Sequence, residues 1–194
     1  MAQSIKQEGL TASKGNKKLH KSVLIWNLPS VKTCPNYVNC KDKCYARRAE
    51  KLYPSVLPCR MKNWQASKQS DFVNNMIALI KKSKCSLVRV HESGDFYSQT
   101  YADKWSEIAA NLPEVQFFAY TKSPYRPSAP NFNIVESILP SGEVNFTDNT
   151  KRLYQWAKTY KAKVCPYGLS KKDFTCGKEC KACVTNKYVV FKKH

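Results

Sequence analysis

Short apolar segments of strand length alternate with longer segments of helical spacing along most of this chain. The helical segments place their apolar residues on one face, and most strand segments end in polar or turn-forming residues. Strands separated by helices in this way are typical of a parallel α/β sheet. Four or five such units are too few for a closed eight-stranded barrel, so we expect a partial (βα) barrel-like parallel sheet. The strands are expected at 23–29, 86–92, 115–121, 133–139 and 187–191, and the helices at 70–82, 98–112 and 153–160.

The length of 194 residues fits a single domain with a sizeable core. Residues 1–20 are basic, and we expect them to be a mobile leader. Residues 21–164 are expected to form the α/β core, and residues 165–194 a cysteine-rich segment of the same domain. No apolar run is long enough to cross a bilayer, and the N-terminus lacks the apolar core of a signal peptide. These features predict a cytoplasmic protein without a membrane partner.

The chain contains nine cysteines, and in a reducing compartment clustered cysteines are more often metal ligands or catalytic thiols than disulfides. Cys34, Cys40 and Cys44 follow the first expected strand directly, where α/β proteins carry their functional sites. Three thiolates would hold a [4Fe–4S] cluster with one iron open to substrate. A zinc ion would need a fourth ligand, for which Cys59 and His91 are candidates.

A second cysteine group lies near the C-terminus, in the stretch CGKECKAC. The Cys-x-x-x-Cys-x-x-Cys spacing is that of radical S-adenosylmethionine (radical SAM) enzymes, but only eleven residues follow it. A catalytic cluster needs downstream strands to hold its cofactor and substrate, so this stretch does not open such a fold. Four ligands close a site, which predicts a structural, electron-carrying or auxiliary iron–sulfur centre, with zinc as the alternative. The expected ligands are Cys165, Cys176, Cys180 and Cys183.

Polar residues end two neighbouring expected strands, in the segments VRVHESGDF and AYTKS. Carboxylate and hydroxyl oxygens in the first segment could accept hydrogen bonds from an ammonium group, and its glycine permits close approach of a ligand. The alternative is an ordinary strand-to-helix turn with capping side chains. No catalytic residue is assigned. The candidate cofactor-binding residues are His91, Glu92, Ser93, Gly94, Asp95, Tyr120 and Lys122.

The formal net charge of +19 comes from lysines and arginines spread along the whole chain. Such an excess predicts a polyanionic partner, DNA or RNA, because neutralised phosphates release their counterions. The alternative is a lysine-rich surface that only keeps the protein in solution.

Several segments together resemble the phage gene product 88 family: VLIWNLPSVKTCP, CKDKCYARRAE, VRVHESGDFYSQTYADKW, FFAYTKS and the C-terminal cysteine stretch. The resemblance spans about residues 19–194 and implies a phage or mobile-element origin, hence the cytoplasm of the host cell.

A broader likeness is to radical SAM proteins. There, a three-cysteine loop after the first strand holds the cluster, and a glycine-containing turn after the second holds the amino group of S-adenosylmethionine. The first feature matches Cys34, Cys40 and Cys44, and the second matches Ser93, Gly94 and Asp95, although the Cys-x5-Cys-x3-Cys spacing is longer than the common form. This likeness implies cluster-based radical chemistry, and a nucleic-acid substrate would account for the basic charge. The alternative is a non-enzymatic, metal-stabilised nucleic-acid-binding or regulatory protein.

Overall fold

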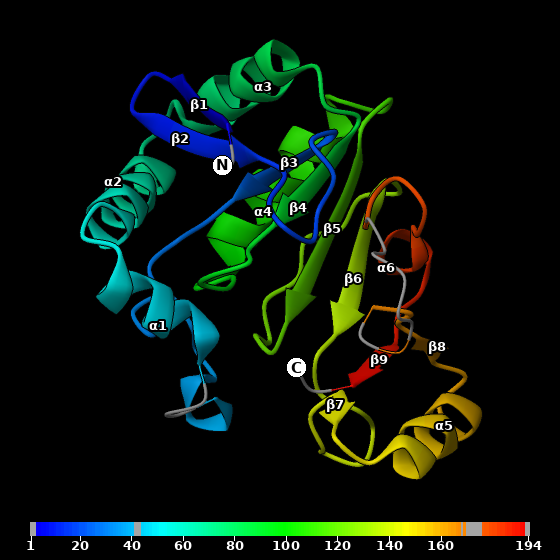
Figure 1. Cartoon of the computed structure of the whole chain (residues 1–194). Helices are drawn as coiled ribbons and strands as arrows, with labels where there is room; N and C mark the ends of the chain where they lie inside the picture. Colours follow the sequence, from blue (N-terminus) through cyan, green and yellow to red (C-terminus); the bar gives the residue numbers. More distant parts are fainter. Residues whose placement is uncertain (1–2, 41–43, 168, 170–175, 193–194) are drawn as a thin grey trace.

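The main feature of the fold is a six-stranded sheet, which Figure 1 shows in the centre of the molecule. The computed structural model describes residues 3–40, 44–167, 169 and 176–192. The last four strands of the sheet are parallel and follow chain order, which confirms the expected parallel α/β arrangement. The strands are, in sheet order, β1 (Gln3–Gln7), β2 (Leu10–Lys14), β3 (Val23–Trp26), β4 (Leu87–Val90), β5 (Gln116–Thr121) and β6 (Phe132–Glu136). Because β1 and β6 are the edges of an open order, the arrangement does not establish a partial barrel.

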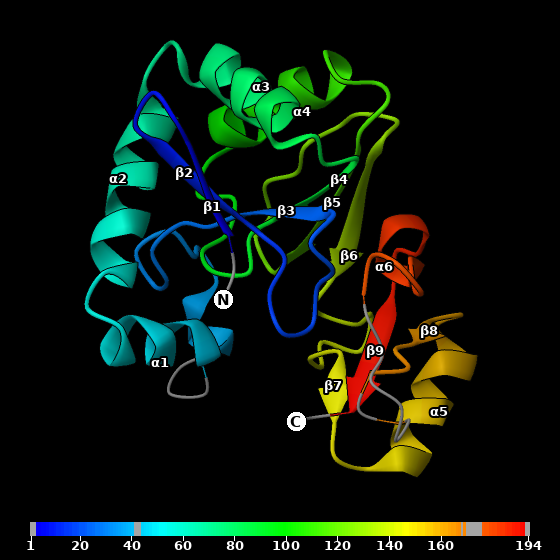
Figure 2. The ribbon, with the colours of Figure 1, turned by 45° about the horizontal axis from the view of Figure 1, so that its top comes forward.

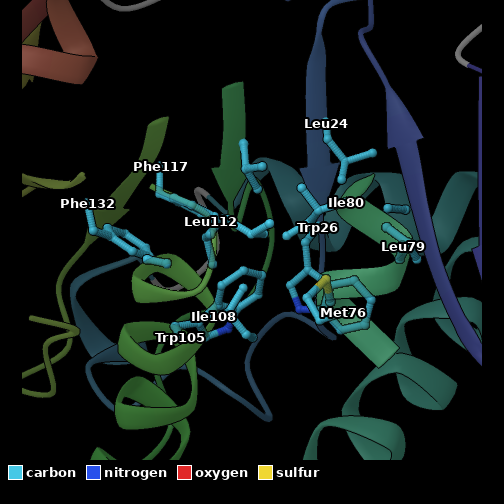
Figure 3. Packing of buried hydrophobic residues seen from close by; sticks show 14 of the residues in the cluster. Leu24, Trp26, Met76, Leu79, Ile80, Trp105, Ile108, Leu112, Phe117 and Phe132 are labelled. Atoms are coloured by element: carbon cyan, nitrogen blue, oxygen red, sulfur yellow. The ribbon is translucent and has the colours of Figure 1, made fainter. Parts of the chain in front are cut away.

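Helices cover one face of this sheet (Figure 2). The apolar side chains of β3 and β4 on this face pack against α3 (Phe72–Ser83) and α4 (Gln99–Ala110). Figure 3 shows this packing, with Trp26 beside Met76 and with Trp105 and Ile108 of α4 near Phe117. Two further helices are α1 (Tyr45–Leu52) and α2 (Val56–Lys68). The apolar spacing expected for α3 and α4 therefore marks the faces that build the main core.

The other face of the sheet, called the second face here, is covered by a different part of the chain. Its buried side chains are Val23, Ile25, Leu87 and Phe118, which pack with Leu19. Cys176, Cys183 and Val184 of the C-terminal segment lie against them. The C-terminal cysteine segment is therefore packed onto the main sheet.

A small second sheet and one helix form a group beyond β6 (Figure 1). Its parallel strands are ordered β7 (Phe146–Thr147), β9 (Val189–Lys192) and β8 (Lys163–Val164). Leu153 and Trp156 of α5 (Thr150–Thr159) pack with Val190 of β9. The expected last strand thus belongs to this small sheet. The short elements are a 3-10 helix, η1 (Tyr37–Asn39), and α6 (Ala182–Thr185).

The N-terminal segment corrects one expectation: residues 3–14 are not a mobile leader but an antiparallel hairpin that extends the main sheet. Glu8 and Gly9 form its two-residue turn, both with positive φ, 40° and 77°, which suits the tight hairpin turns that connect antiparallel strands. The exposed fractions of Leu10 and Ala12 are only 1% and 3%. Burial of these side chains in the main core explains why the segment is ordered. Within the described part of the chain, no helix is long and apolar enough to cross a membrane.

Candidate functional site at the carboxyl edge of the sheet

The loop after β3 and the turn after β4 are joined by hydrogen bonds at the carboxyl edge of the parallel strands. The Asn27 side-chain oxygen accepts from the backbone N–H groups of Glu92 and Ser93, at 2.8 and 2.9 Å. The Leu28 backbone N–H donates to the Ser93 carbonyl at 3.0 Å, and the Ser93 hydroxyl donates to the Leu28 carbonyl at 2.9 Å. The described part of the cysteine-bearing loop, residues 27–40, is therefore docked directly on the predicted cofactor turn.

Gly94 makes this docking possible. Its φ of +82° lies in the left-handed region that favours glycine. A Cβ atom at this position would lie 2.6 Å from the Leu28 Cβ and 2.6 Å from the Thr33 Oγ1, which is too close for real atoms. The next residue, Asp95, donates its backbone N–H to the Thr33 carbonyl at 3.1 Å. The sequence predicted the close approach of a ligand at Gly94. In the structure, the cysteine loop of the same chain makes this close approach.

The carboxylate of Asp95 ties the ends of β4 and β5 together. One oxygen accepts from the Thr121 hydroxyl and the Phe96 N–H, at 2.5 and 2.9 Å. The other accepts from the N–H groups of Lys122 and Ser123, at 3.0 and 3.2 Å. Burial raises the pKa of Asp95, while these hydrogen bonds act in the opposite direction. Since each oxygen already accepts two hydrogen bonds, the carboxylate has a structural role at this edge.

Of the three cysteines of the loop, Cys34 lies near Asp95. Burial raises the pKa of Cys34 to about 12, and the negative charge of Asp95 adds to the effect. Charges on Cys44 and Cys40 raise the pKa of Cys34 further, so both of these thiols lie within electrostatic range of Cys34. A hydrogen bond from the backbone of Val31 lowers the pKa and therefore favours the thiolate. The structure thus brings the three predicted ligands to one neighbourhood at the carboxyl edge.

Val31 is strained in a way that points to function. Its φ of +67° is a genuine outlier for a β-branched residue. Such strain persists only where the surroundings impose it, and it concentrates at functional sites. The preceding residue, Ser30, donates its N–H and hydroxyl to Glu50 at 2.8 and 2.6 Å, and Arg60 pairs with Glu50 at 2.8 Å. We did not expect this anchor from the sequence, because no local pattern pairs the loop with α1 and α2.

His91, a candidate cofactor or zinc ligand, lies in the core. Its ring packs against Phe96 at 4.8 Å, and its Nε2 lies 3.0 Å from the Tyr101 hydroxyl. Its Nδ1 has no hydrogen-bond partner among the described residues. Burial lowers the pKa of His91 to about 3, so the ring is neutral at physiological pH. The structure does not bring the His91 ring together with the cysteines of the loop.

The remaining candidate residues have different surroundings. The Tyr120 hydroxyl lies 2.6 Å from the Cys183 sulfur on the second face, away from the loop. The Lys122 carbonyl accepts from the Asn36 side chain in the cysteine loop, so Lys122 lies at the predicted site. The Glu92 carboxylate accepts from the Asn16 side-chain amide at 2.8 Å. Of these three residues, Glu92 and Lys122 therefore remain beside the loop, and Tyr120 belongs to the C-terminal cysteine group.

The four C-terminal cysteines also gather in one region. Charges on Cys165 and Cys180 raise the pKa of Cys176, and charges on Cys165 and Cys176 raise the pKa of Cys183. Burial is the largest cause in both cases and brings the pKa of Cys183 to about 11. Among the described residues, however, no three His, Cys, Asp or Glu side chains are arranged closely enough to hold a metal ion. Metal binding at either cysteine group therefore remains a prediction.

Comparison with known proteins identifies the family. The model of the family described as "Gene product 88" matches residues 3–187 of this chain. The chain belongs to the gene product 88 family. Two similar proteins are the Gene 88 proteins of Mycobacterium phages D29 and L5, which are 30% and 29% identical over 102 residues. No solved structure matches the chain.

The gene product 88 match extends over nearly all of the described fold. The matched range includes the N-terminal hairpin, the cysteine loop and all four C-terminal cysteines. The curated phage relatives match a smaller part: the aligned segment is 46% of this chain and 42% and 43% of their lengths. The chain thus spans less than half the length of these relatives. The comparisons support the phage family and add no support for the radical SAM likeness.

Proposed function

We propose that this gene product 88 protein holds an iron–sulfur cluster through Cys34, Cys40 and Cys44, in a layout like that of radical SAM proteins. One observation carries the proposal: the strained backbone of Val31 directs a hydrogen bond to the Cys34 thiol. A strained backbone lowers the stability of the folded protein. A hydrogen bond that favours the thiolate form of a cysteine supports metal binding, because the thiolate is the form that binds a metal. The loop that carries Cys34 is also hydrogen-bonded to the turn that contains Gly94 and packs closely against it.

The donor set fits an iron–sulfur cluster better than a closed zinc site. The thiols of Cys40 and Cys44 lie within electrostatic range of Cys34, while His91, a candidate fourth ligand, is packed in the core. A cluster with three thiolate ligands keeps one iron open, and it would supply an electron to whatever binds there. The protein's contribution would be to position that iron at the carboxyl edge and to shield it from water.

The polar turn does not fit direct recognition of S-adenosylmethionine by Ser93 or Asp95. The Ser93 hydroxyl donates to Leu28, and the Asp95 oxygens accept four hydrogen bonds within the protein. Lys122 and Glu92 lie beside the loop through their backbone carbonyls, which accept from the side chains of Asn36 and Tyr45. We therefore propose the cluster without assigning S-adenosylmethionine a role in a reaction.

The experiment is metal analysis of the full chain purified without oxygen. We expect iron and sulfide in the native protein, and loss of about one cluster in Cys40→Ser, because three thiolates hold it. Cys59→Ser is the matched control, since Cys59 lies on α2 outside both cysteine groups. Zinc without iron in the native protein, or unchanged iron in Cys40→Ser, would disprove the proposal.

The same samples test the radical SAM layout. If added S-adenosylmethionine changes the electron paramagnetic resonance spectrum of the reduced cluster, the ligand occupies the open iron. An unchanged spectrum with iron present would leave an iron–sulfur protein of another kind.

A second candidate function, nucleic-acid binding, rests on the net charge of +19. A basic protein of this size attracts phosphate backbones irrespective of sequence. This function is compatible with the cluster, because a nucleic acid could be either its substrate or a partner that it never modifies.

A further inference from the structure

A half-buried arginine, Arg89, lies on the second face with aromatic rings around its guanidinium. The Arg89 guanidinium lies 5.4 Å from the centre of the Tyr120 ring and 6.0 Å from that of Phe118. Its one ion pair in the described structure is with Glu92 at 3.4 Å, and its Nε has no hydrogen-bond partner among the described residues. The side chain is only 19% exposed. A partly desolvated guanidinium of this kind can offset negative charge that lies on the same face of the sheet.

The C-terminal cysteines lie on the same face of the sheet. Cys183 contacts the Tyr120 hydroxyl through its sulfur, 2.6 Å away, and Cys176 packs in the same apolar cluster. Cys176 and Cys180 are bridge partners, and the Gly177 N–H donates to the Cys180 carbonyl at 2.9 Å. This turn therefore brings the backbone of two cysteines together directly above the sheet.

Gly177 and Cys165 complete this cysteine group. Gly177 has a φ of +89°, and a Cβ there would lie 2.4 Å from a methyl carbon of Val23, so only glycine lets the turn pack this closely. Cys165 is held by its backbone N–H, which donates to the Val190 carbonyl at 2.8 Å. The backbone of Tyr167 also hydrogen-bonds to the Cys165 thiol. Hydrogen bonds to sulfur are typical of metal–thiolate sites.

We propose that Cys165, Cys176, Cys180 and Cys183 form a closed metal–thiolate centre on the second face, with Arg89 as its positioning residue and counter-charge. Four thiolates around a divalent ion carry a net charge of about −2, and the Arg89 guanidinium would offset part of it. Metal binding would draw the four sulfur atoms closer together than they are in the present structure. This inference does not depend on what occupies the loop of Cys34.

The centre would fasten the C-terminal segment to the sheet. The Cys176 N–H donates to the Lys18 carbonyl at 3.0 Å and the His20 N–H donates to the Cys176 carbonyl at 2.9 Å, so the segment already pairs with the chain before β3. Arg89 connects this region to the carboxyl edge through Glu92, whose carbonyl accepts from the Tyr45 hydroxyl. Tyr45 directly follows Cys44 of the first loop. Arg89 therefore lies between the two cysteine groups.

The test is a Co²⁺ titration of the reduced, metal-free full chain that carries Cys40→Ser, which disables the first loop. Thiolate–cobalt charge-transfer absorption reports sulfur ligands directly. We expect an intensity that fits four thiolates, and a loss of intensity in Cys180→Ser. Arg89→Met should weaken Co²⁺ binding about ten- to a hundredfold, as changes to residues that support metal ligands do. Arg89→Lys, which restores the charge, should recover part of that loss.

The control is Lys81→Met on the exposed side of α3, which removes the same charge from the opposite layer of the fold. It should bind Co²⁺ like the parent. Absence of thiolate–cobalt absorption in the parent would overturn the centre, and equal affinity in Arg89→Met and Lys81→Met would overturn the role of Arg89. If Arg89→Met does not fold, Arg89→Lys is compared with the parent instead, and equal affinity of these two proteins would overturn a positioning role of the guanidinium. An unchanged charge-transfer band in Cys183→Ser would exclude Cys183 as a ligand.

Discussion

Individual residues at the carboxyl edge owe their roles to what surrounds them. His91 and Asp95 lie in the same polar turn, four positions apart. The His91 ring is buried among aromatic side chains, whereas the Asp95 carboxylate joins two strand ends. His91 also has a φ of +68°, in the left-handed region that non-glycine residues rarely adopt. At this scale, burial shifts the pKa of each group, downward for His91 and upward for Asp95.

His91 should make the protein less stable in mild acid. The pKa of His91 is about 3 in the folded protein against an ordinary value of 6.5, so the unfolded chain binds more protons below pH 6.5. The stabilising effect of the neutral ring is thus complete above pH 6.5 and is lost as the pH falls towards 3. The expected slope is up to about 1.4 kcal/mol per pH unit.

The measurement is urea unfolding between about pH 7 and 5, where most carboxylates remain ionised. His91→Asn is the comparison, because asparagine tolerates the left-handed conformation and does not titrate. The variant should lose most of the pH dependence. A parent and a variant with parallel slopes would show that His91 does not control acid stability.

At the scale of elements, two loops behave as one unit because backbone and side-chain groups join them. The described part of the cysteine loop, residues 27–40, docks on the turn of residues 91–95 through Asn27, Leu28 and Thr33. Their closest approach is at Gly94, where no side chain fits. The geometry of the three-cysteine loop therefore depends on the turn after the neighbouring strand.

Gly94→Ala should separate the two loops. The substitution adds a strained φ, which costs about 1 kcal/mol, and a clash with Leu28 and Thr33 that brings the total to roughly 2–4 kcal/mol. Urea unfolding gives the loss of stability, and metal analysis should show less iron bound to the first loop. Gly142→Ala is the matched control, because Gly142 has a φ of +81° but no atom within 4 Å of the added methyl group. Equal losses in the two variants would mean that strain alone matters and that the docking does not.

Helix α2 shows why some elements could not be predicted. Its buried residues are polar, Asn63 and Ser67, so it has no apolar stripe of helical spacing. The Asn63 side chain accepts from the Thr11 N–H at 2.9 Å and donates to the carbonyls of Thr11 and Asn27, at 2.8 and 3.0 Å. Helices α3 and α4, which bury apolar faces, were predicted close to their observed bounds. Hydrophobic periodicity therefore finds elements that pack by apolar contact and misses those held by side-chain hydrogen bonds.

At the scale of the whole molecule, charge is the property with the longest range. The net charge of +19 belongs to the chain as a whole, and a polyanion that binds it would release counterions. We expect binding to DNA or RNA that weakens steeply between about 50 and 200 mM salt, by about a thousandfold if roughly six phosphates are neutralised.

Fluorescence anisotropy at several salt concentrations measures this dependence, and its slope gives the number of phosphates. A peptide nucleic acid of the same base sequence is the control, because its uncharged backbone should not bind. Absence of DNA and RNA binding at about 50 mM salt, or equal binding to the uncharged backbone, would refute the prediction.

The sequence by itself determined the parallel strands, the main apolar helices and the position of the cysteine loop after the first parallel strand, because local spacing encodes all three. Only the tertiary structure decided that Leu10 lies in the core, that Asp95 joins two strand ends and that Tyr120 faces Cys183. These outcomes depend on which strands pair and on which side of the sheet each residue falls. A strand alternates its side chains between two faces, and the chain that covers each face can come from far along the sequence. Residues 176–184 cover the second face in this way, whereas residues 3–14 extend the sheet itself.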